Sequence, residues 1–225
     1  MLKLTAAIMG LVVLAGSAMA EQFREGEHYQ RIGTPVSVSG ERVEVIEAFA
    51  YPCPACRNFL PHIKSWEEEQ DGNVDFRRLP IALQRGWDLF ARAYYTAQVV
   101  GVDEGAHEAM FRALHDERRQ FRSFEDVAEF YSDFGVEKEA FINTSESFAV
   151  DSRMRQNRNH VRQFGIRSTP TVIVHGKWRV QPNNFGSYSE MMEAVKYLVE
   201  REAANLEAAG EGAEAEVGED AEAAS

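Results

Sequence analysis

The stretch that most constrains the fold of this chain is residues 43–66, where both cysteines lie between an apolar run and an amphipathic run. The apolar run, residues 43–50, is short and rich in valine and isoleucine, so it favours a central strand over a helix. Cys53 and Cys56 follow this strand directly. Any fold of the chain must therefore place a CxxC pair at the end of a strand.

The residues after the cysteines favour a helix, because apolar side chains recur there at helical spacing. This apolar stripe consists of Phe59, Leu60, Ile63 and Trp66. Pro54 falls in the first turn, where a missing N–H costs nothing. We therefore expect the CxxC pair at the N-terminal end of a helix that packs on the sheet.

The two cysteines favour redox chemistry over a structural role. Only two residues separate Cys53 from Cys56, so a disulfide between them would close a very short loop and add little chain-entropy stabilisation. A zinc site would need two further ligands, and the six histidines show no paired spacing that would supply them. We interpret the pair as a redox-active dithiol and expect no metal ion and no cofactor. A metal site and an inert disulfide are the alternatives.

Residues 1–20 have the pattern of a secretory signal peptide. Lys3 precedes an apolar segment, and Ala18-Met19-Ala20 matches an A-x-A cleavage site. The apolar segment is shorter than the ~18 residues that a membrane-spanning helix needs. We therefore expect cleavage near Ala20 and export of the mature chain to an oxidising compartment, the periplasm.

The formal net charge of −12 is concentrated at the C-terminal end, where residues 207–225 hold seven acidic side chains and no basic one. The Ala, Gly and Glu composition of this end predicts a disordered acidic tail over residues 205–225. Removing these seven negative charges and the positive charge of Lys3 from the total leaves −6 for the folded body. A body of this charge offers no electrostatic footprint for nucleic acid, so we expect no nucleic-acid partner.

Between these ends, the hydrophobic period changes twice. A period of 3.6 over residues 87–148 predicts a run of helices. His107 lies within one of their apolar faces, where a core or partly exposed histidine is favoured over a ligand. The pattern then returns to α/β, with a hairpin of strands at 169–174 and 177–180 before a last helix.

The order of these elements resembles the thioredoxin superfamily, and its DsbA family in particular. The residues that carry the resemblance are the segments EAFAYPCPAC at 47–56 and FGIRSTPT at 164–171, together with the helical block between them. It covers about residues 27–202 and implies an α/β architecture, a thioredoxin fold with an inserted helical domain. The domain organisation that we expect is a signal peptide at 1–20, a thioredoxin-like domain built from 21–84 and 149–204, an inserted helical domain at 85–148, and the tail at 205–225.

The position of Cys53 at a helix N-terminus has a chemical consequence that does not depend on the resemblance. A thiolate there meets unpaired backbone N–H groups and the positive end of the helix dipole. The pKa of Cys53 should fall from about 8.5 into the range of about 3.5–7.5, and a stable thiolate makes the disulfide a good oxidant. We expect a substrate thiolate to attack Cys53, and Cys56 to be the resolving cysteine.

By resemblance, Glu47 matches the acidic residue that lies beneath the cysteines of DsbA and thioredoxin proteins and helps to move the proton of the resolving thiol. A buried carboxyl would have a raised pKa and could act as acid or base near neutrality. The alternative is a strand glutamate that faces solvent. Pro54 and Ala55 should tune the pair. Ala55 departs from the histidine that DsbA proteins often carry, so we predict that Cys53 is less acidic than in a Pro-His protein.

Thr169-Pro170 would, by resemblance, be the cis-proline loop that faces the CxxC pair and binds the substrate backbone. The trans isomer is the default for an X-Pro bond, and the resemblance implies cis here. A proline that opens a strand need not donate to the ladder. Many DsbA proteins carry valine before this proline, so Thr169 is a second departure from the family pattern.

The resemblance implies an exported thiol:disulfide oxidoreductase that donates its disulfide to reduced, unfolded proteins entering the periplasm. It also implies a DsbB-like membrane partner that reoxidises the CxxC pair, and we expect the protein to be a monomer. A reductase or isomerase of the same superfamily is the nearest alternative, although residues 21–40 leave no room for the dimerisation domain that isomerases usually carry. A non-catalytic peptide-binding chaperone is an alternative of a different class.

Overall fold

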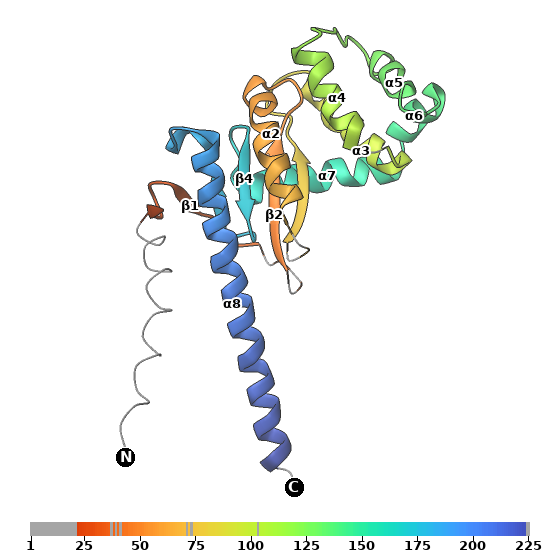
Figure 1. Ribbon diagram of the computed structural model, residues 1–225. Helices are drawn as coiled ribbons and strands as arrows, with labels where there is room; N and C mark the ends of the chain where they lie inside the picture. The colour runs from red at the N-terminus through yellow and green to blue at the C-terminus, as the bar shows by residue number, and fades with distance from the viewer. Residues whose placement is uncertain are drawn as a thin grey trace, which may run out of the picture.

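The computed structural model describes residues 22–223 except positions 37, 39, 41, 71, 73 and 103, and it describes side chains up to Gly210. The predicted signal peptide, residues 1–20, lies outside the described residues. Five strands form one sheet in the order β1-β5-β4-β2-β3 (Figure 1). The strands are β1 (Tyr29–Arg31), β2 (Val43–Phe49), β3 (Val74–Pro80), β4 (Thr171–Val174) and β5 (Trp178–Val180).

Strand β2 lies inside the sheet, as the apolar run predicted. It pairs in parallel with β3 and antiparallel with β4. Strands β4 and β5 form the predicted hairpin, whose turn residues His175 and Gly176 have φ values of 50° and 63°, as a two-residue hairpin turn requires. A side chain at Gly176 would also meet the Val36 carbonyl oxygen at 2.3 Å, so only glycine fits there.

Helices cover both faces of the sheet. On one face, α2 (Pro54–Glu68) and α8 (Tyr188–Ala223) bury an apolar cluster with β2, β4 and β5. On the other face, α7 (Phe148–Gln163) and the segment after it pack Phe164 and Ile166 against Ile46 and Ile173. This is the layered thioredoxin fold, and it sets α2 directly above β2.

The helical insertion consists of α3 (Trp87–Val100), α4 (Glu104–His115), α5 (Phe124–Ser132) and α6 (Lys138–Ser145). Its core is continuous with the region around the cysteines, because one apolar cluster contains Phe111 and Phe141 of the insertion together with Phe49 and Cys56. The same cluster takes in Val150 and Met154 of α7. The predicted domain boundary at residue 148 therefore coincides with the start of α7, but the hydrophobic core continues across it.

Helix α8 differs from the expectation at its C-terminal end. The backbone is helical to Ala223, whereas composition predicted a disordered tail from residue 205. Alanine and glutamate dominate residues 205–225 and are strong helix formers, so this segment can continue a helix that the body has nucleated. The last side chain of α8 that packs against the described core is Leu206.

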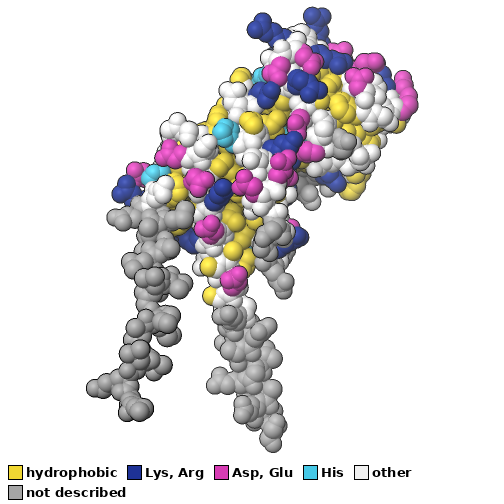
Figure 2. All heavy atoms as spheres, in the orientation of Figure 1, with side chains coloured by type: hydrophobic (Ala, Val, Ile, Leu, Met, Phe, Trp, Pro, Cys, Tyr) yellow, Lys and Arg dark blue, Asp and Glu magenta, His cyan; other side chains and the backbone are white. Residues whose placement is uncertain are grey.

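The charge distribution of the surface and the hydropathy of the helices complete the description of the fold. Acidic and basic side chains are interspersed over the face in Figure 2, which includes α2 and α8. No helix within the described residues is both long enough and apolar enough to span a membrane.

Candidate active site

The two cysteines occupy the N-terminal end of α2. Cys53 is the N-cap residue and has extended backbone angles, and Pro54 follows in the first turn. The Cys53 carbonyl accepts hydrogen bonds from the backbone N–H groups of Cys56 at 3.1 Å and Arg57 at 3.2 Å, which begins the helix. Both cysteines are free thiols, and Cys56 is fully buried beneath Cys53 in the core shared with the insertion.

The two thiols have opposite acidities. The pKa of Cys53 falls from 9.0 to about 5, first because of its hydrogen bond with Cys56 and despite the opposing effect of burial. The Thr169 side chain and the backbone N–H groups at the helix start lower it further. Burial, followed by the hydrogen bond with Cys53, raises the pKa of Cys56 far above its ordinary value. The site therefore holds one thiolate and one protonated thiol near neutral pH.

Thr169 and Pro170 lie against the cysteines, although 116 residues separate Cys53 from Thr169 in the chain. The Thr169-Pro170 bond is cis, as predicted. The Cys53 sulfur lies 3.5 Å from the Thr169 carbonyl oxygen, to which it donates when it is protonated. Pro170 is buried and directly precedes β4. The turn before β4 therefore forms the second wall of the dithiol site.

Glu47 is completely buried, which excludes a solvent-facing glutamate. Its strand neighbours show which face it occupies: Val45 clusters with Phe59 of α2, and Phe49 clusters with Cys56. Alternate strand residues share a face, so Glu47 lies between them on the side that α2 covers. Burial raises the pKa of Glu47 from 4.5 to about 7, although Arg78 opposes this shift. The carboxyl can thus exchange a proton near neutral pH.

Arg78 is a site residue that the sequence analysis missed. It stands opposite Glu47 in the β2–β3 register and is 8% exposed. Its guanidinium donates to Glu47 at 3.2 Å and to Glu67 at 2.7 Å, and it pairs with Glu104 at 3.0 Å. The available signal was an arginine within a predicted strand; the register places it on the same face of the sheet as Glu47, where a buried charge needs a partner.

Histidines of α4 hold the turn that leads to the cysteines. His107 is buried, as predicted, and its Nδ1 atom lies 2.9 Å from the Tyr51 hydroxyl. His115 bonds the Tyr51 carbonyl oxygen through Nε2 at 2.7 Å. Within the described residues, no group of three or more His, Cys, Asp and Glu side chains is arranged to hold a metal ion.

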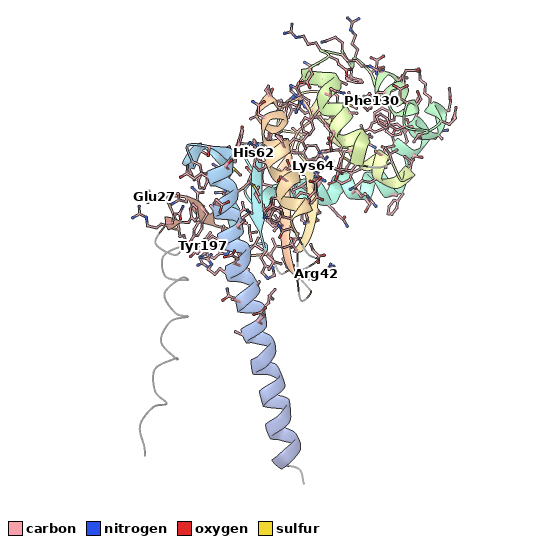
Figure 3. All side chains as sticks on the ribbon, in the orientation of Figure 1. Glu27, Arg42, His62, Lys64, Phe130 and Tyr197 are labelled. Carbon is pink, nitrogen blue, oxygen red and sulfur yellow. The ribbon has the colours of Figure 1, made fainter. Side chains whose placement is uncertain are left out.

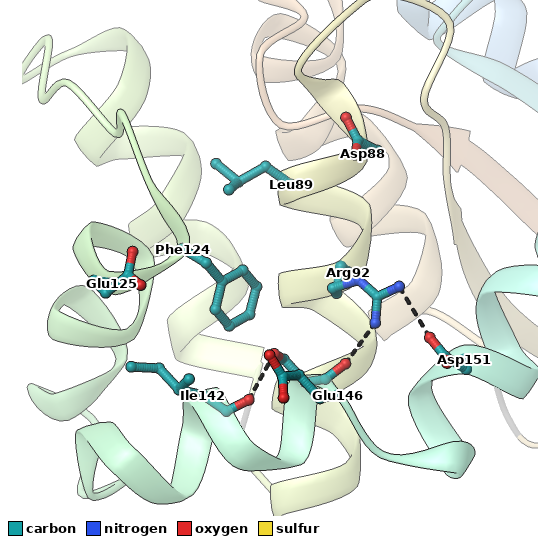
Figure 4. A pocket seen from close by; sticks show the side chains of 9 residues that line it. Asp88, Leu89, Arg92, Phe124, Glu125, Ile142, Glu146 and Asp151 are labelled. Carbon is teal, nitrogen blue, oxygen red and sulfur yellow. Dashed lines mark hydrogen bonds and ion pairs between the residues drawn. The ribbon is translucent and has the colours of Figure 1, made fainter.

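A cavity of about 490 Å³ lies in the helical insertion (Figure 4). Leu89, Phe124 and Ile142 supply its apolar lining, and Arg92 closes one side through an ion pair with Asp151 at 2.9 Å. None of the predicted site residues lines this cavity. The candidate active site is therefore at the cysteines and not in this cavity.

The chain resembles known proteins over most of its length. A family model described as a DSBA-like thioredoxin domain matches residues 44–198. The thiol:disulfide interchange protein DsbA of Pseudomonas aeruginosa is 32% identical over 204 residues, which is 90% of this chain and 97% of the relative. DsbA of Pseudomonas syringae pv. tomato is 31% identical over 211 residues, which is 92% of this chain and 98% of the relative.

Solved structures agree with these relatives. The crystal structure of Pseudomonas aeruginosa DsbA superimposes with a TM-score of 0.79 at 32% identity, covering 84% of this chain and 98% of that chain. The crystal structure of the oxidoreductase DsbA from Xylella fastidiosa superimposes with a TM-score of 0.74 at 32% identity, covering 80% of this chain and 97% of that chain. With a family model that matches most of the chain and a CxxC pair at the start of α2, the chain belongs to the DsbA family of thiol:disulfide oxidoreductases, in the thioredoxin superfamily.

Proposed function

We propose that this protein works as an oxidase in the periplasm, donating a Cys53–Cys56 disulfide to reduced, unfolded proteins that have just been exported. The observation that carries the proposal is the place of Cys53 as the N-cap of α2, directly above the buried Cys56, where the pKa of Cys53 is lowered to about 5. A thiolate stabilised at neutral pH stabilises the reduced dithiol, so the disulfide readily accepts electrons. The signal-peptide pattern of residues 1–20 supports the periplasmic location.

The reaction transfers two electrons from substrate thiols to the disulfide. A substrate thiolate attacks Sγ of Cys53, forming a mixed disulfide and breaking the Cys53–Cys56 bond. The Cys56 sulfur leaves as a thiolate and takes up a proton, as its raised pKa requires. A second substrate thiolate then attacks the substrate sulfur of the mixed disulfide, which releases the oxidised substrate and the Cys53 thiolate.

Glu47 and Thr169-Pro170 have supporting roles in this proposal. Glu47, whose pKa is about 7, exchanges the proton of Cys56. The backbone at Thr169-Pro170, which already contacts Cys53, pairs with the substrate chain. Pro54 and Ala55 set how stable the Cys53 thiolate is.

The reduced protein must be reoxidised before another cycle. We assign this step to a DsbB-like membrane protein that passes the electrons to a quinone, and we expect the oxidoreductase itself to act as a monomer. The P. aeruginosa relative carries the name thiol:disulfide interchange protein DsbA, which supports the same cycle here.

Transfer to a reduced, denatured model protein tests the proposal. The oxidised wild type should transfer one disulfide per molecule. Cys56→Ser, first loaded at Cys53 as a mixed disulfide with glutathione, should release glutathione to the attacking substrate thiolate and accumulate a mixed disulfide between Cys53 and the substrate. A double Cys→Ser variant is the matched control. If this control protects the substrate from aggregation as well as the wild type does, and no disulfide is transferred, the protein is a chaperone and the proposal is wrong.

An equilibrium titration against glutathione separates an oxidase from a reductase. The dithiol of an oxidase should become oxidised only at a much higher proportion of oxidised glutathione than the dithiol of a reductase requires. A protein that remains oxidised in strongly reducing mixtures would instead be a reductase of the same superfamily.

A further inference from the structure

The first residue of α8 lies against the CxxC turn. The Tyr188 hydroxyl donates a hydrogen bond to the Ala55 carbonyl oxygen at 3.2 Å. Its ring packs on two side chains of α2, with ring centroids 5.3 Å from Phe59 and 5.6 Å from His62. Figure 3 labels His62 where α2 faces the N-terminal end of α8. Tyr188 is thus held between two helices, with its hydroxyl aimed at the backbone between the cysteines.

The carbonyl that Tyr188 contacts belongs to the same planar peptide group as the Cys56 N–H. That N–H is among the groups that stabilise the Cys53 thiolate. A hydrogen bond to the oxygen of a peptide polarises the N–H on its other side, since consecutive hydrogen bonds strengthen one another. It also fixes the plane of the peptide, and therefore the direction in which the N–H points.

We propose that Tyr188 is a positioning residue for the dithiol: its hydroxyl holds and polarises the Ala55–Cys56 peptide, whose N–H then binds the Cys53 thiolate more strongly. The inference rests on the proposed oxidase function and adds a residue to it. Ala55 has no side-chain donor for the sulfur, so from this position the thiolate is supported only by the backbone of the turn, which adds to the hydrogen bond from the Cys56 thiol. Tyr188 supports that backbone from outside α2.

The electrostatic surroundings of Tyr188 agree with this position. Burial raises the pKa of Tyr188, and its electrostatic interactions with Cys56 and Cys53 raise this pKa further. The hydroxyl is therefore close enough to sense both sulfurs. It also stays protonated at neutral pH and remains available as a donor.

The test is Tyr188→Phe, which removes the hydroxyl and keeps the ring. The ultraviolet absorbance of the thiolate, followed against pH, should show the pKa of Cys53 rising by about 0.3–0.5 unit. The equilibrium constant for oxidation of glutathione should fall by about two- to threefold as a consequence. The matched control is Tyr197→Phe on the same helix, whose ring packs on Phe23 and Tyr29, and it should change neither quantity.

An unchanged or lowered pKa of Cys53 in Tyr188→Phe would overturn the inference. So would an equal rise in Tyr197→Phe, because the effect would then follow from loosening α8. Thermal unfolding of both variants measures any structural effect separately. Failure of the wild type to oxidise a reduced substrate would instead reject the proposed function, while the pKa comparison would still decide the role of Tyr188.

Discussion

At the scale of single residues, we predict that Ala55 limits how strong an oxidant this protein is. It is half-buried beside Cys53 and offers the thiolate only its backbone. Ala55→His adds a side chain that can donate to the sulfur, and a hydrogen bond to a charged group contributes about 1.5–3 kcal/mol. We expect the pKa of Cys53 to fall by about one unit and the glutathione equilibrium constant to rise about tenfold.

Ala55→Phe is the control for this change, because it adds a ring of similar size without a donor. A glutathione titration of the three proteins compares them directly. If Ala55→His titrates like the wild type, or if Ala55→Phe shifts as far, hydrogen bonding from this position does not tune the dithiol.

Glu47 is the second residue with a measurable role. Its native pKa of about 7 lies above its ordinary value of 4.5, so the native state keeps a proton that the unfolded state releases in this window. The contribution of the Glu47 carboxyl to the free energy of unfolding is therefore lost as pH rises from about 4.5 to 7. Glu47→Gln should gain stability relative to the wild type over that range, and it should slow resolution of the mixed disulfide by Cys56.

Urea unfolding of the reduced proteins at pH 5 and pH 8 measures the first effect, and stopped-flow kinetics measures the second. Glu44→Gln is the control, since Glu44 lies on the same strand but pairs with Arg77 near the surface. A stability difference between Glu47→Gln and the wild type that is independent of pH would contradict the pKa argument. An unchanged rate of resolution would remove Glu47 from the proton transfer.

At the scale of the element, the start of α2, where Cys56 and the backbone N–H groups stabilise the Cys53 thiolate, makes the stability of the reduced state depend on pH. The pKa of Cys53 is lowered from 9.0 to about 5, so between these values the unfolded state holds a proton that the native state has lost. Stability of the reduced form should therefore rise with pH across this window and lose this contribution as pH falls to 5. The oxidised form has no thiol to titrate and provides the reference.

The measurement is the difference in melting temperature between the reduced and oxidised protein from pH 5 to pH 8. Groups such as Glu47 titrate in both the reduced and the oxidised form, so their contributions to the pH dependence of the melting temperature largely cancel in this difference. Reduced Cys53→Ala should lose the rise with pH. A flat difference in the wild type would mean that the helix N-terminus does not stabilise the thiolate.

At the scale of the whole molecule, α8 has two parts with different energetic weight. Its body-facing part includes Glu202, which is 1% exposed and bonds the Trp178 indole N–H and the Lys177 ammonium, each at 2.6 Å. Ending the chain after Gly210 leaves these contacts intact. Because surface changes stay within about 0.5 kcal/mol, we expect the melting temperature to change by no more than about 2 °C, with the redox equilibrium unaltered.

Ending the chain after Val199 provides the contrasting case. It removes Glu202 and Leu206 and leaves buried partners unpaired, so the melting temperature should fall by far more. Thermal unfolding of the two truncated proteins measures this difference. If the cut after Gly210 were as damaging as the cut after Val199, the acidic end would contribute to the fold.

Local spacing alone determined the strand, the CxxC turn, the helix after it and the helical block, because hydrophobic period and turn residues act over a few positions. It also determined that Cys53 would be the acidic thiol, since a helix N-terminus follows from the same local pattern. The prediction of a cis bond at Thr169-Pro170 rested on the family resemblance and not on residue spacing.

Tertiary structure decided the partners of these residues. Arg78 opposite Glu47 depends on the register of β2 and β3, the contact of Cys53 with Thr169 joins positions 116 residues apart, and Tyr188 reaches Ala55 only because α8 packs on α2. Long-range packing leaves no periodic mark in the chain, and burial sets the acidity of Glu47 only once the helices have covered the sheet. The sequence by itself thus predicted which sulfur is the acidic one, and the tertiary structure decided what surrounds it.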